Sequence, residues 1–244
     1  MSSTVARKDG KSVGAGRDDL VRIRAGWLSV TAVAALAVFA TMWLGFALHW
    51  GWLADVDDAA LSAAYSYGIA RPGWVTAWDV FCTVMGPLGF RLVGLAIIVA
   101  ALVRRQYRVA LFLALTVELS GIVTELVKSV VDRPRPDTAM VYALSSSFPS
   151  GHALGVIVSV LALLCVARPA LSGRVYMWLC VFGAAVVVLI GVGRVVLNVH
   201  HPSDVVAGWG LGYAYFVAVY LLCPPYPAPV TAADETPATP GSGR

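Results

Sequence analysis

The sequence predicts an all-α, polytopic membrane protein with six transmembrane helices in one bundle and both termini in the cytoplasm. Composition, the spacing of apolar segments and the placement of basic residues predict this fold. Of the 244 residues, 59% are hydrophobic and only 13% are charged, and the mean hydropathy is +0.77. A water-soluble domain of this size needs more charge to cover its surface, whereas lipid favours an apolar surface. The composition therefore excludes a large soluble domain.

Six apolar segments come close to the ~20 residues that cross a bilayer. They cover residues 26–49, about 85–103, 109–127, 152–167, 175–194 and 203–223. The first segment is too long for the apolar part of a signal peptide, so we expect a retained helix. Residues 50–73 predict an external loop with an interfacial helix, and the stretch up to Val84 predicts a second interfacial segment.

The chain divides into one membrane domain and two tails. Residues 25–223 form the predicted six-helix domain. Residues 1–24 are polar and basic, and residues 224–244 are rich in Pro, Ala and Thr. Neither tail has an apolar period, so we expect both to be disordered.

The basic residues predict the orientation. Six spans place both termini on one side, and that side collects 12 of the 18 Lys and Arg residues. Because cytoplasmic loops carry the excess of basic residues, the termini are expected in the cytoplasm. The six outer basic residues are Arg71, Arg91, Lys128, Arg133, Arg135 and Arg194.

Composition also bounds the ligands. The basic residues lie at helix ends and in short loops rather than in one stripe, which argues against nucleic acid. The four cysteines, Cys82, Cys165, Cys180 and Cys223, form no CxxC pair and indicate packing rather than disulfides or zinc. No carboxylate cluster indicates Mg²⁺, so we expect neither a metal nor a cofactor.

Three polar segments fall at helix ends on the predicted outer side, at residues 128–136, 149–152 and 193–204. They bring three cations, Lys128, Arg135 and Arg194, to one edge of the membrane. Such a grouping is costly unless an anion joins it, and the planar fork of arginine suits phosphate. We therefore expect these three side chains to bind phosphate.

The second segment predicts further phosphate ligands. Ser150 is a natural N-cap, which places Gly151 and His152 in the first helical turn. Free N–H groups and the positive end of the helix dipole favour an anion there, and Gly151 lets the backbone approach it. Ser150 and the Gly151 amide therefore join the predicted phosphate site.

The third segment suits nucleophilic catalysis. Pro202 can open the last helix, so that the Asp204 carboxylate accepts a hydrogen bond from Nδ1–H of His200. Nε2 of His200 would then attack phosphorus, while His152 protonates the leaving alkoxide and later activates water. Glu125 lies one turn before Lys128 and could position it; an interhelical hydrogen bond is the alternative for Glu125 and for Glu118.

Each signal is weak alone. A single outer arginine is most often a headgroup anchor, Pro-Ser-Gly is common in loops, and a histidine beside proline is usually structural. The specific observation is that all three segments occur in order at helix ends on one side.

Together, Lys128-x6-Arg135-Pro136, Pro149-Ser150-Gly151-His152 and Arg194-x5-His200-x3-Asp204 resemble the signature of the type 2 phosphatidic acid phosphatase superfamily. The resemblance covers roughly residues 70–222. It implies that the cations, Ser150 and Gly151 bind phosphate, that His152 is the general acid, and that Asp204 orients the nucleophile His200. The family usually has Ser before the third-motif arginine, where this chain has Gly193, so one hydroxyl donor to phosphate is expected to be missing.

The predicted function is metal-independent hydrolysis of a lipid phosphomonoester or diphosphate at the outer face of the cell membrane, through a phosphohistidine. A polyprenyl (di)phosphate such as undecaprenyl diphosphate is slightly favoured over phosphatidic acid or phosphatidylglycerol phosphate, on family frequency alone. The alternatives are a lipid transporter or flippase, in which paired broken helices are expected, and an inactive lipid-phosphate-binding scaffold. The expected partners are the lipid substrate and the bilayer, and the sequence makes no prediction of oligomeric state.

Overall fold

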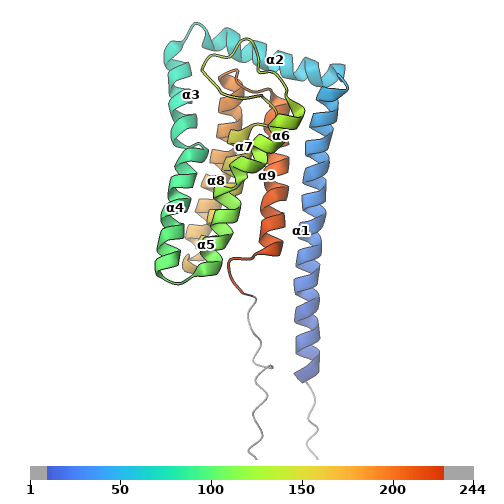
Figure 1. Cartoon of the computed structure of the whole chain (residues 1–244), viewed down its shortest axis with the longest axis vertical. Coiled ribbons are helices and arrows are strands. Elements are labelled where there is room, and N and C mark those ends of the chain that lie inside the picture. The colour runs from blue at the N-terminus through green and yellow to red at the C-terminus, as the bar shows by residue number, and fades with distance from the viewer. Residues whose placement is uncertain (1–9, 228–244) are drawn as a thin grey trace, which may run out of the picture.

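The computed structural model describes residues 10–227, in which helices are joined by loops and no strand occurs (Figure 1). The elements in chain order are α1 (Gly10–Ala47), α2 (Gly51–Gly68), α3 (Pro72–Val84), α4 (Pro87–Val103), α5 (Tyr107–Leu113), the π-helix η1 (Ala114–Glu118), α6 (Ser120–Val131), α7 (Gly151–Ala167), the short 3₁₀ helix η2 (Arg168–Ala170), α8 (Gly173–Val196) and α9 (Pro202–Leu222).

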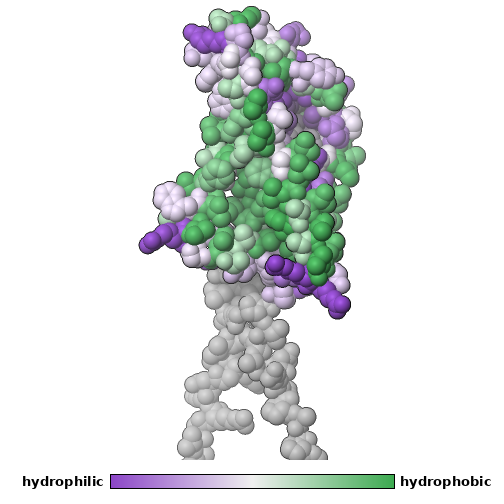
Figure 2. Space-filling model, turned by 90° about the vertical axis from the view of Figure 1, so that its left-hand side faces the viewer, coloured by the Kyte–Doolittle hydropathy of each residue, from purple (hydrophilic) through white to green (hydrophobic). Residues whose placement is uncertain are grey.

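Six helical stretches in the described residues are long and apolar enough to cross a membrane. They are Ala25–Ala47, Pro72–Val103, Tyr107–Val131, Gly151–Ala170, Gly173–Val196 and Pro202–Leu222. Figure 2 shows a broad hydrophobic band on the α3–α4 side of the molecule, with polar residues gathered toward both ends. The expected all-α, six-span fold is confirmed.

The helix boundaries follow local signals. Ser150 and Ser172 cap α7 and α8 by accepting hydrogen bonds from the backbone N–H three residues later. Prolines open α3, α4 and α9, where a missing N–H costs nothing. Helix α6 ends at Val131, and the φ of 45° at Asp132 turns the chain out of the helix.

Helix α7 lies at the centre of the bundle and contacts α4, α6, α8 and α9. A Cβ atom at Gly208 would lie 2.6 Å from the Ser150 carbonyl oxygen, and one at Gly212 would lie 3.0 Å from that of Leu154. The two glycines, spaced four apart, therefore let α9 approach α7 closely, as their spacing predicts. This approach brings the start of α9 beside the start of α7.

Two regions differ from expectation. Helix α1 begins at Gly10 and so includes residues 10–24, which were expected to be a disordered tail. A helix already formed by the apolar segment can extend without a new nucleation step. Residues 1–9 and 228–244 of the two predicted tails lie outside the described residues, and the division into a domain and tails stays a prediction.

The prediction of an interfacial segment up to Val84 is wrong. Helix α3 runs along the bundle in line with α4, and α2 is the helix that lies across the end of the bundle (Figure 1). The break falls at Gly86-Pro87, because proline disfavours a helical residue before it. Helix α3 stays upright because Trp78 and Cys82 pack against Gly193 of α8.

Candidate active site

The three predicted segments meet at the end of the bundle opposite Gly10 and Leu222 (Figure 1). They line a cavity of about 500 Å³ between α4, α6, the loop that precedes α7, and the helix ends. The predicted residues that line it are Glu125, Lys128, Arg135, Gly151, His152, Arg194 and His200. Residues separated by more than 70 positions along the chain thus face one space.

His200 lies in the turn between α8 and α9 and is 2% exposed. Its Nε2 is 3.3 Å from a terminal nitrogen of Arg135, and its Nδ1 is 3.6 Å from Oδ2 of Asp204. Because a guanidinium can only donate, Nε2 is the acceptor in this contact and carries the lone pair. The proton of the neutral ring is then on Nδ1, on the side of Asp204.

Burial lowers the pKa of His200 to about 4, and the positive charges of Arg194 and Arg135 act in the same direction, while the Asp204 carboxylate opposes the shift. The ring is therefore neutral near pH 7. A neutral imidazole with Nε2 unprotonated is the form that can attack an electrophile.

Asp204 is completely buried behind His200 and does not line the cavity. Its Oδ1 accepts a 2.7 Å hydrogen bond from Arg133. Its Oδ2 accepts from the backbone N–H of His201 at 2.8 Å and from the Ser147 hydroxyl, and lies 3.1 Å from Nδ1 of His201. These bonds fix the carboxylate relative to His200.

Arg133 joins Asp204 to α2. One terminal nitrogen donates to Asp204 and to the Ser203 hydroxyl, both at 2.7 Å, and the other donates to Asp57 at 3.0 Å. Asp57 in turn accepts from the Ser203 N–H at 3.0 Å and from its hydroxyl at 2.5 Å. We call Asp57, Arg133, Ser147, Ser203 and Asp204 the buried carboxylate network.

The three predicted phosphate-binding cations differ in how far protein groups satisfy them. Lys128 donates to the Ser145 hydroxyl at 2.8 Å and lies 3.9 Å from Glu125. Arg135 donates to three backbone carbonyls, those of Leu144, Ser145 and Val199. Arg194 is buried, yet its Nε has no hydrogen-bond partner and its guanidinium forms no ion pair within residues 10–227.

The start of α7 forms another wall of the cavity. Gly151 and His152 line it, and their N–H groups have no acceptor within the helix because they belong to its first turn. Ser150 does not line the cavity: it is completely buried, and its hydroxyl caps α7. The structure therefore gives Ser150 a capping contact, and a direct bond to phosphate stays a prediction.

Gly193 is explained by its neighbours. A Cβ atom there would lie 2.5 Å from Sγ of Cys82 and 2.8 Å from the ring of Trp78. Position 193 therefore faces α3 rather than the cavity, and a serine in this chain would meet Trp78 instead of a bound phosphate.

Sequence reasoning did not single out Asp57, Arg133, Ser147 or Ser203. One signal was present for Asp57: Leu53, Asp57 and Leu61 follow at intervals of four, and all three are buried on one face of α2. An acid within an apolar stripe needs a buried partner. The partner itself, Arg133, lies 76 residues away, and no local pattern indicates it.

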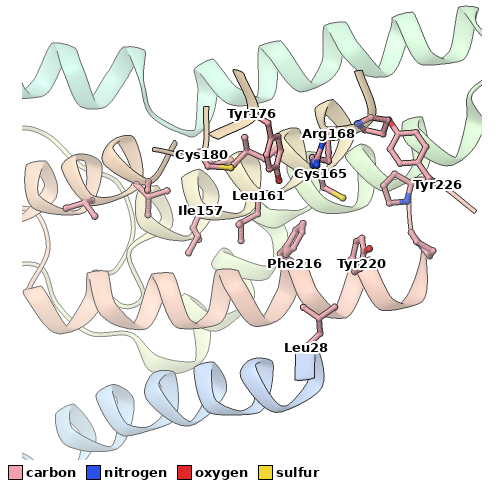
Figure 3. Close-up of a pocket in the computed structure, with 18 residues that line it drawn as sticks. Leu28, Ile157, Leu161, Cys165, Arg168, Tyr176, Cys180, Phe216, Tyr220 and Tyr226 are labelled. Carbon is pink, nitrogen blue, oxygen red and sulfur yellow. The ribbon is translucent and has the colours of Figure 1, made fainter. Parts of the chain in front are cut away.

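A larger cavity of about 810 Å³ lies at the opposite end of the bundle (Figure 3). Its lining is mostly apolar and comes from α7, η2, α8, α9 and residues 224–226, with Leu28 of α1, and it includes Arg168, Tyr176 and Tyr226. None of the predicted catalytic or phosphate-binding residues lines it. Size alone therefore does not identify the reactive site.

Comparisons with known proteins agree with the predicted kind of site. The family model of the PAP2 superfamily matches residues 109–226, which contain all three segments. Phosphatidylglycerophosphatase B of Bacillus subtilis is 28% identical over 180 residues, which are 72% of this chain and 87% of that protein. An undecaprenyl-diphosphatase of Sulfolobus acidocaldarius is 32% identical over 116 residues, 45% of this chain and 52% of that protein.

A solved structure extends the likeness to the fold. The crystal structure of a transmembrane PAP2-type phosphatidylglycerolphosphate phosphatase from Bacillus subtilis superimposes with a TM-score of 0.67 at 25% identity. The match covers 79% of this chain and 95% of that chain. The fold, the cavity and these relatives define a multi-pass membrane phosphatase that acts on lipid phosphates. Residues 109–226 of this chain belong to the PAP2 superfamily.

Proposed function

We propose that this enzyme releases phosphate from a lipid phosphomonoester or diphosphate through a phosphohistidine on His200. The observation that carries the proposal is the orientation of the ring. Its Nε2 lone pair faces the cavity beside Arg135, and its Nδ1 faces Asp204. A nucleophile backed by a carboxylate and placed among cations is the arrangement that phosphoryl transfer requires.

In the first step, Nε2 of His200 attacks phosphorus, and the bond from phosphorus to the lipid oxygen breaks. His152 gives its proton to the leaving oxygen, and Asp204 stabilises the positive charge on the His200 ring. In the second step, His152 takes a proton from water, the water oxygen attacks phosphorus, and the nitrogen–phosphorus bond breaks. Lys128, Arg135, Arg194 and the N-terminus of α7 stabilise the charge on the phosphoryl oxygens in both steps.

The cavity is open to a lipid from the side of α6. Ile122 and Leu144 line it and are 57% and 72% exposed. Both are apolar, so the hydrocarbon part of a lipid can lie against them while its phosphate occupies the cavity. Lateral access of this kind suits a substrate that stays in the bilayer.

We further propose that the cavity faces the extracytoplasmic side. Five arginines lie in or within two residues of the two short connections at the other end of the bundle: Arg104, Arg105, Arg108, Arg168 and Arg174. The excess of basic residues in cytoplasmic loops supports placing that end in the cytoplasm. Modification of a cysteine introduced at Tyr142, which is 86% exposed near the cavity, by an impermeant reagent on intact cells tests this orientation.

The relatives' names support a lipid phosphate as substrate and differ in which lipid they act on. They include a phosphatidylglycerophosphatase, an undecaprenyl-diphosphatase and a lipid A 1-phosphatase of Rhizobium etli, 27% identical over 158 residues. The slight preference for a polyprenyl (di)phosphate drawn from the sequence therefore stays a prediction.

Phosphate release from purified protein in detergent tests the proposal. The substrates are phosphatidic acid, phosphatidylglycerol phosphate and undecaprenyl diphosphate, each assayed with a metal chelator. We expect His200→Ala to lower turnover by on the order of 10⁴-fold or more on every accepted lipid. His49→Asn is the matched control, because His49 is exposed and asparagine tolerates its φ of 56°. Near-normal turnover by folded His200→Ala contradicts the proposal.

A further inference from the structure

Two charged side chains of the active-site cavity have no role in the chemistry above. Arg91 comes from the second turn of α4, and Glu118 ends the π-helix η1. Both line the same cavity as His152, Arg194 and His200. Arg91 lies outside residues 109–226, so the family model does not span it.

Among the described residues, neither charge has an ion-pair partner. Nε of Arg91 and Oε1 of Glu118 are buried atoms with no hydrogen-bond partner, and the two side chains form no ion pair with each other within the described part of the chain. Both residues belong to membrane-spanning segments. Charges in such segments are costly and face a partner or a binding site. We therefore expect the partner of each of these two charges to be a ligand in the cavity.

Two glycines make room for these side chains. A Cβ atom at Gly121 would lie 2.2 Å from a terminal nitrogen of Arg91, and one at Gly94 would lie 3.3 Å from Oε1 of Glu118. Each charged group thus lies over a glycine of the facing helix. The π-helix that ends at Glu118 adds an irregularity of the kind that is frequent at functional sites.

The cavity has room for more than the phosphate that is cleaved. Its volume of about 500 Å³ falls within the range of pockets that hold drug-sized ligands. Lys128, Arg135, Arg194 and the start of α7 already surround the reactive phosphate near His200. Arg91 and Glu118 remain to contact the rest of a headgroup.

We propose that Arg91 and Glu118 form a headgroup subsite that binds the groups next to the scissile phosphate. Arg91 donates to a second anionic phosphate group, and the Glu118 carboxylate accepts from a hydroxyl. The subsite rests on the proposed phosphatase function and specifies its substrate class: a lipid whose headgroup carries both groups. Phosphatidylglycerol phosphate carries both, a polyprenyl diphosphate carries only the second phosphate, and phosphatidic acid carries neither.

The three lipids and a set of variants form one experiment. kcat/KM is measured for each lipid with wild type, Arg91→Gln and Glu118→Gln. Losing a hydrogen bond to a charged group costs about 10- to 100-fold in binding. We expect Arg91→Gln to lower kcat/KM by this factor for phosphatidylglycerol phosphate and the polyprenyl diphosphate, and by less than about threefold for phosphatidic acid. Glu118→Gln should lower it for phosphatidylglycerol phosphate alone.

Gly121→Ala is the third variant and leaves Arg91 in the chain. Its new methyl group meets the flexible end of Arg91, so the fold survives while the guanidinium is displaced. We expect the same substrate pattern as for Arg91→Gln, and Arg91→Lys should recover part of the loss. Arg104→Gln, an exposed arginine at the other end of the bundle, is the control that should change nothing.

Two results overturn the subsite. An equal loss on all three lipids means that Arg91 and Glu118 only support the fold, and no loss on any lipid means that they do not contact substrate. Phosphate release that depends on His200 persists in both cases, so the proposed function survives. Failure of the proposed function has a different signature, which is turnover that persists in His200→Ala.

Discussion

Arg133 and Arg194 are both buried arginines close to His200, but they belong to regions of opposite character. Arg133 donates to Asp57, Ser203 and Asp204 through both of its terminal nitrogens and so belongs to the buried carboxylate network. Arg194 lines the cavity, and its Nε has no partner in the described residues. This difference leads us to predict that Arg133 holds the site together and that Arg194 binds the phosphate.

The charges of the two regions follow the same division. The buried network sets two carboxylates against one guanidinium, which leaves excess negative charge behind the His200 ring. The cavity wall sets Lys128, Arg135 and Arg194 around the space in front of it. In the proposed intermediate, the positive phosphoimidazole ring would lie between the negative network and the cations around its dianionic phosphoryl group, and both regions would stabilise it.

The largest expected effect is a loss of stability on changing Arg133, the arginine of the buried carboxylate network. Arg133→Gln leaves two buried carboxylates without their cation, so it should lower the free energy of unfolding by about 3–5 kcal/mol. Denaturant or thermal unfolding in detergent measures this, with exposed Arg174→Gln as the control. A variant as stable as wild type would show that the network does not support the fold.

Arg194→Gln should give the complementary result. It removes a cation that forms no ion pair within the described residues, so stability should stay the same or rise. Loss of one charge-stabilising donor lowers kcat by about 10²–10³-fold. Steady-state kinetics and unfolding of the same sample test both parts. A loss of stability in Arg194→Gln as large as that in Arg133→Gln would contradict the distinction between the two arginines.

The pKa of His200 tests the environment described for its ring. Because burial lowers its pKa from 6.5 to about 4, the neutral, nucleophilic ring should persist from pH 7 to near pH 5 and be lost as the pH falls through about 4. Nitrogen NMR of histidine-labelled protein, with His200→Gln to identify the signal, measures the midpoint. Arg135→Gln removes a nearby positive charge, so its midpoint should be higher. A wild-type midpoint near 6.5 would mean that the ring is solvated.

Gly193→Ser should have the smallest effect. The hydroxymethyl group meets Trp78 and Cys82, so we expect a loss of about 1–2 kcal/mol in stability and no gain in kcat. Unfolding and turnover are measured together. A higher kcat without destabilisation would show that position 193 reaches the phosphate.

The sequence predicts the cavity wall better than the network behind it. Lys128, Arg135, His152, Arg194 and His200 lie in short segments whose spacing is specific, and the structure brings them to one cavity. Six spans follow from hydropathy, because each apolar segment must be a helix in lipid. These features depend on local pattern, which one sequence carries.

The network could not be predicted because its bonds are long-range. Asp57 bonds with Arg133 and Ser203, 76 and 146 residues away, through a packing of α2 across the bundle that no local pattern specifies. Helix α3 was misplaced for a similar reason. Its contact with Gly193 on α8 keeps it upright, whereas its own composition suits an interface.

Trapping the covalent intermediate tests the central claim most directly. Wild-type enzyme is mixed with lipid labelled in the terminal phosphate, quenched in base within the first turnover, digested and mapped by mass spectrometry. The account predicts an acid-labile, base-stable phosphate on His200 that is absent from His200→Ala. Label on another residue, or turnover without a labelled enzyme under conditions that slow the water step, would contradict it.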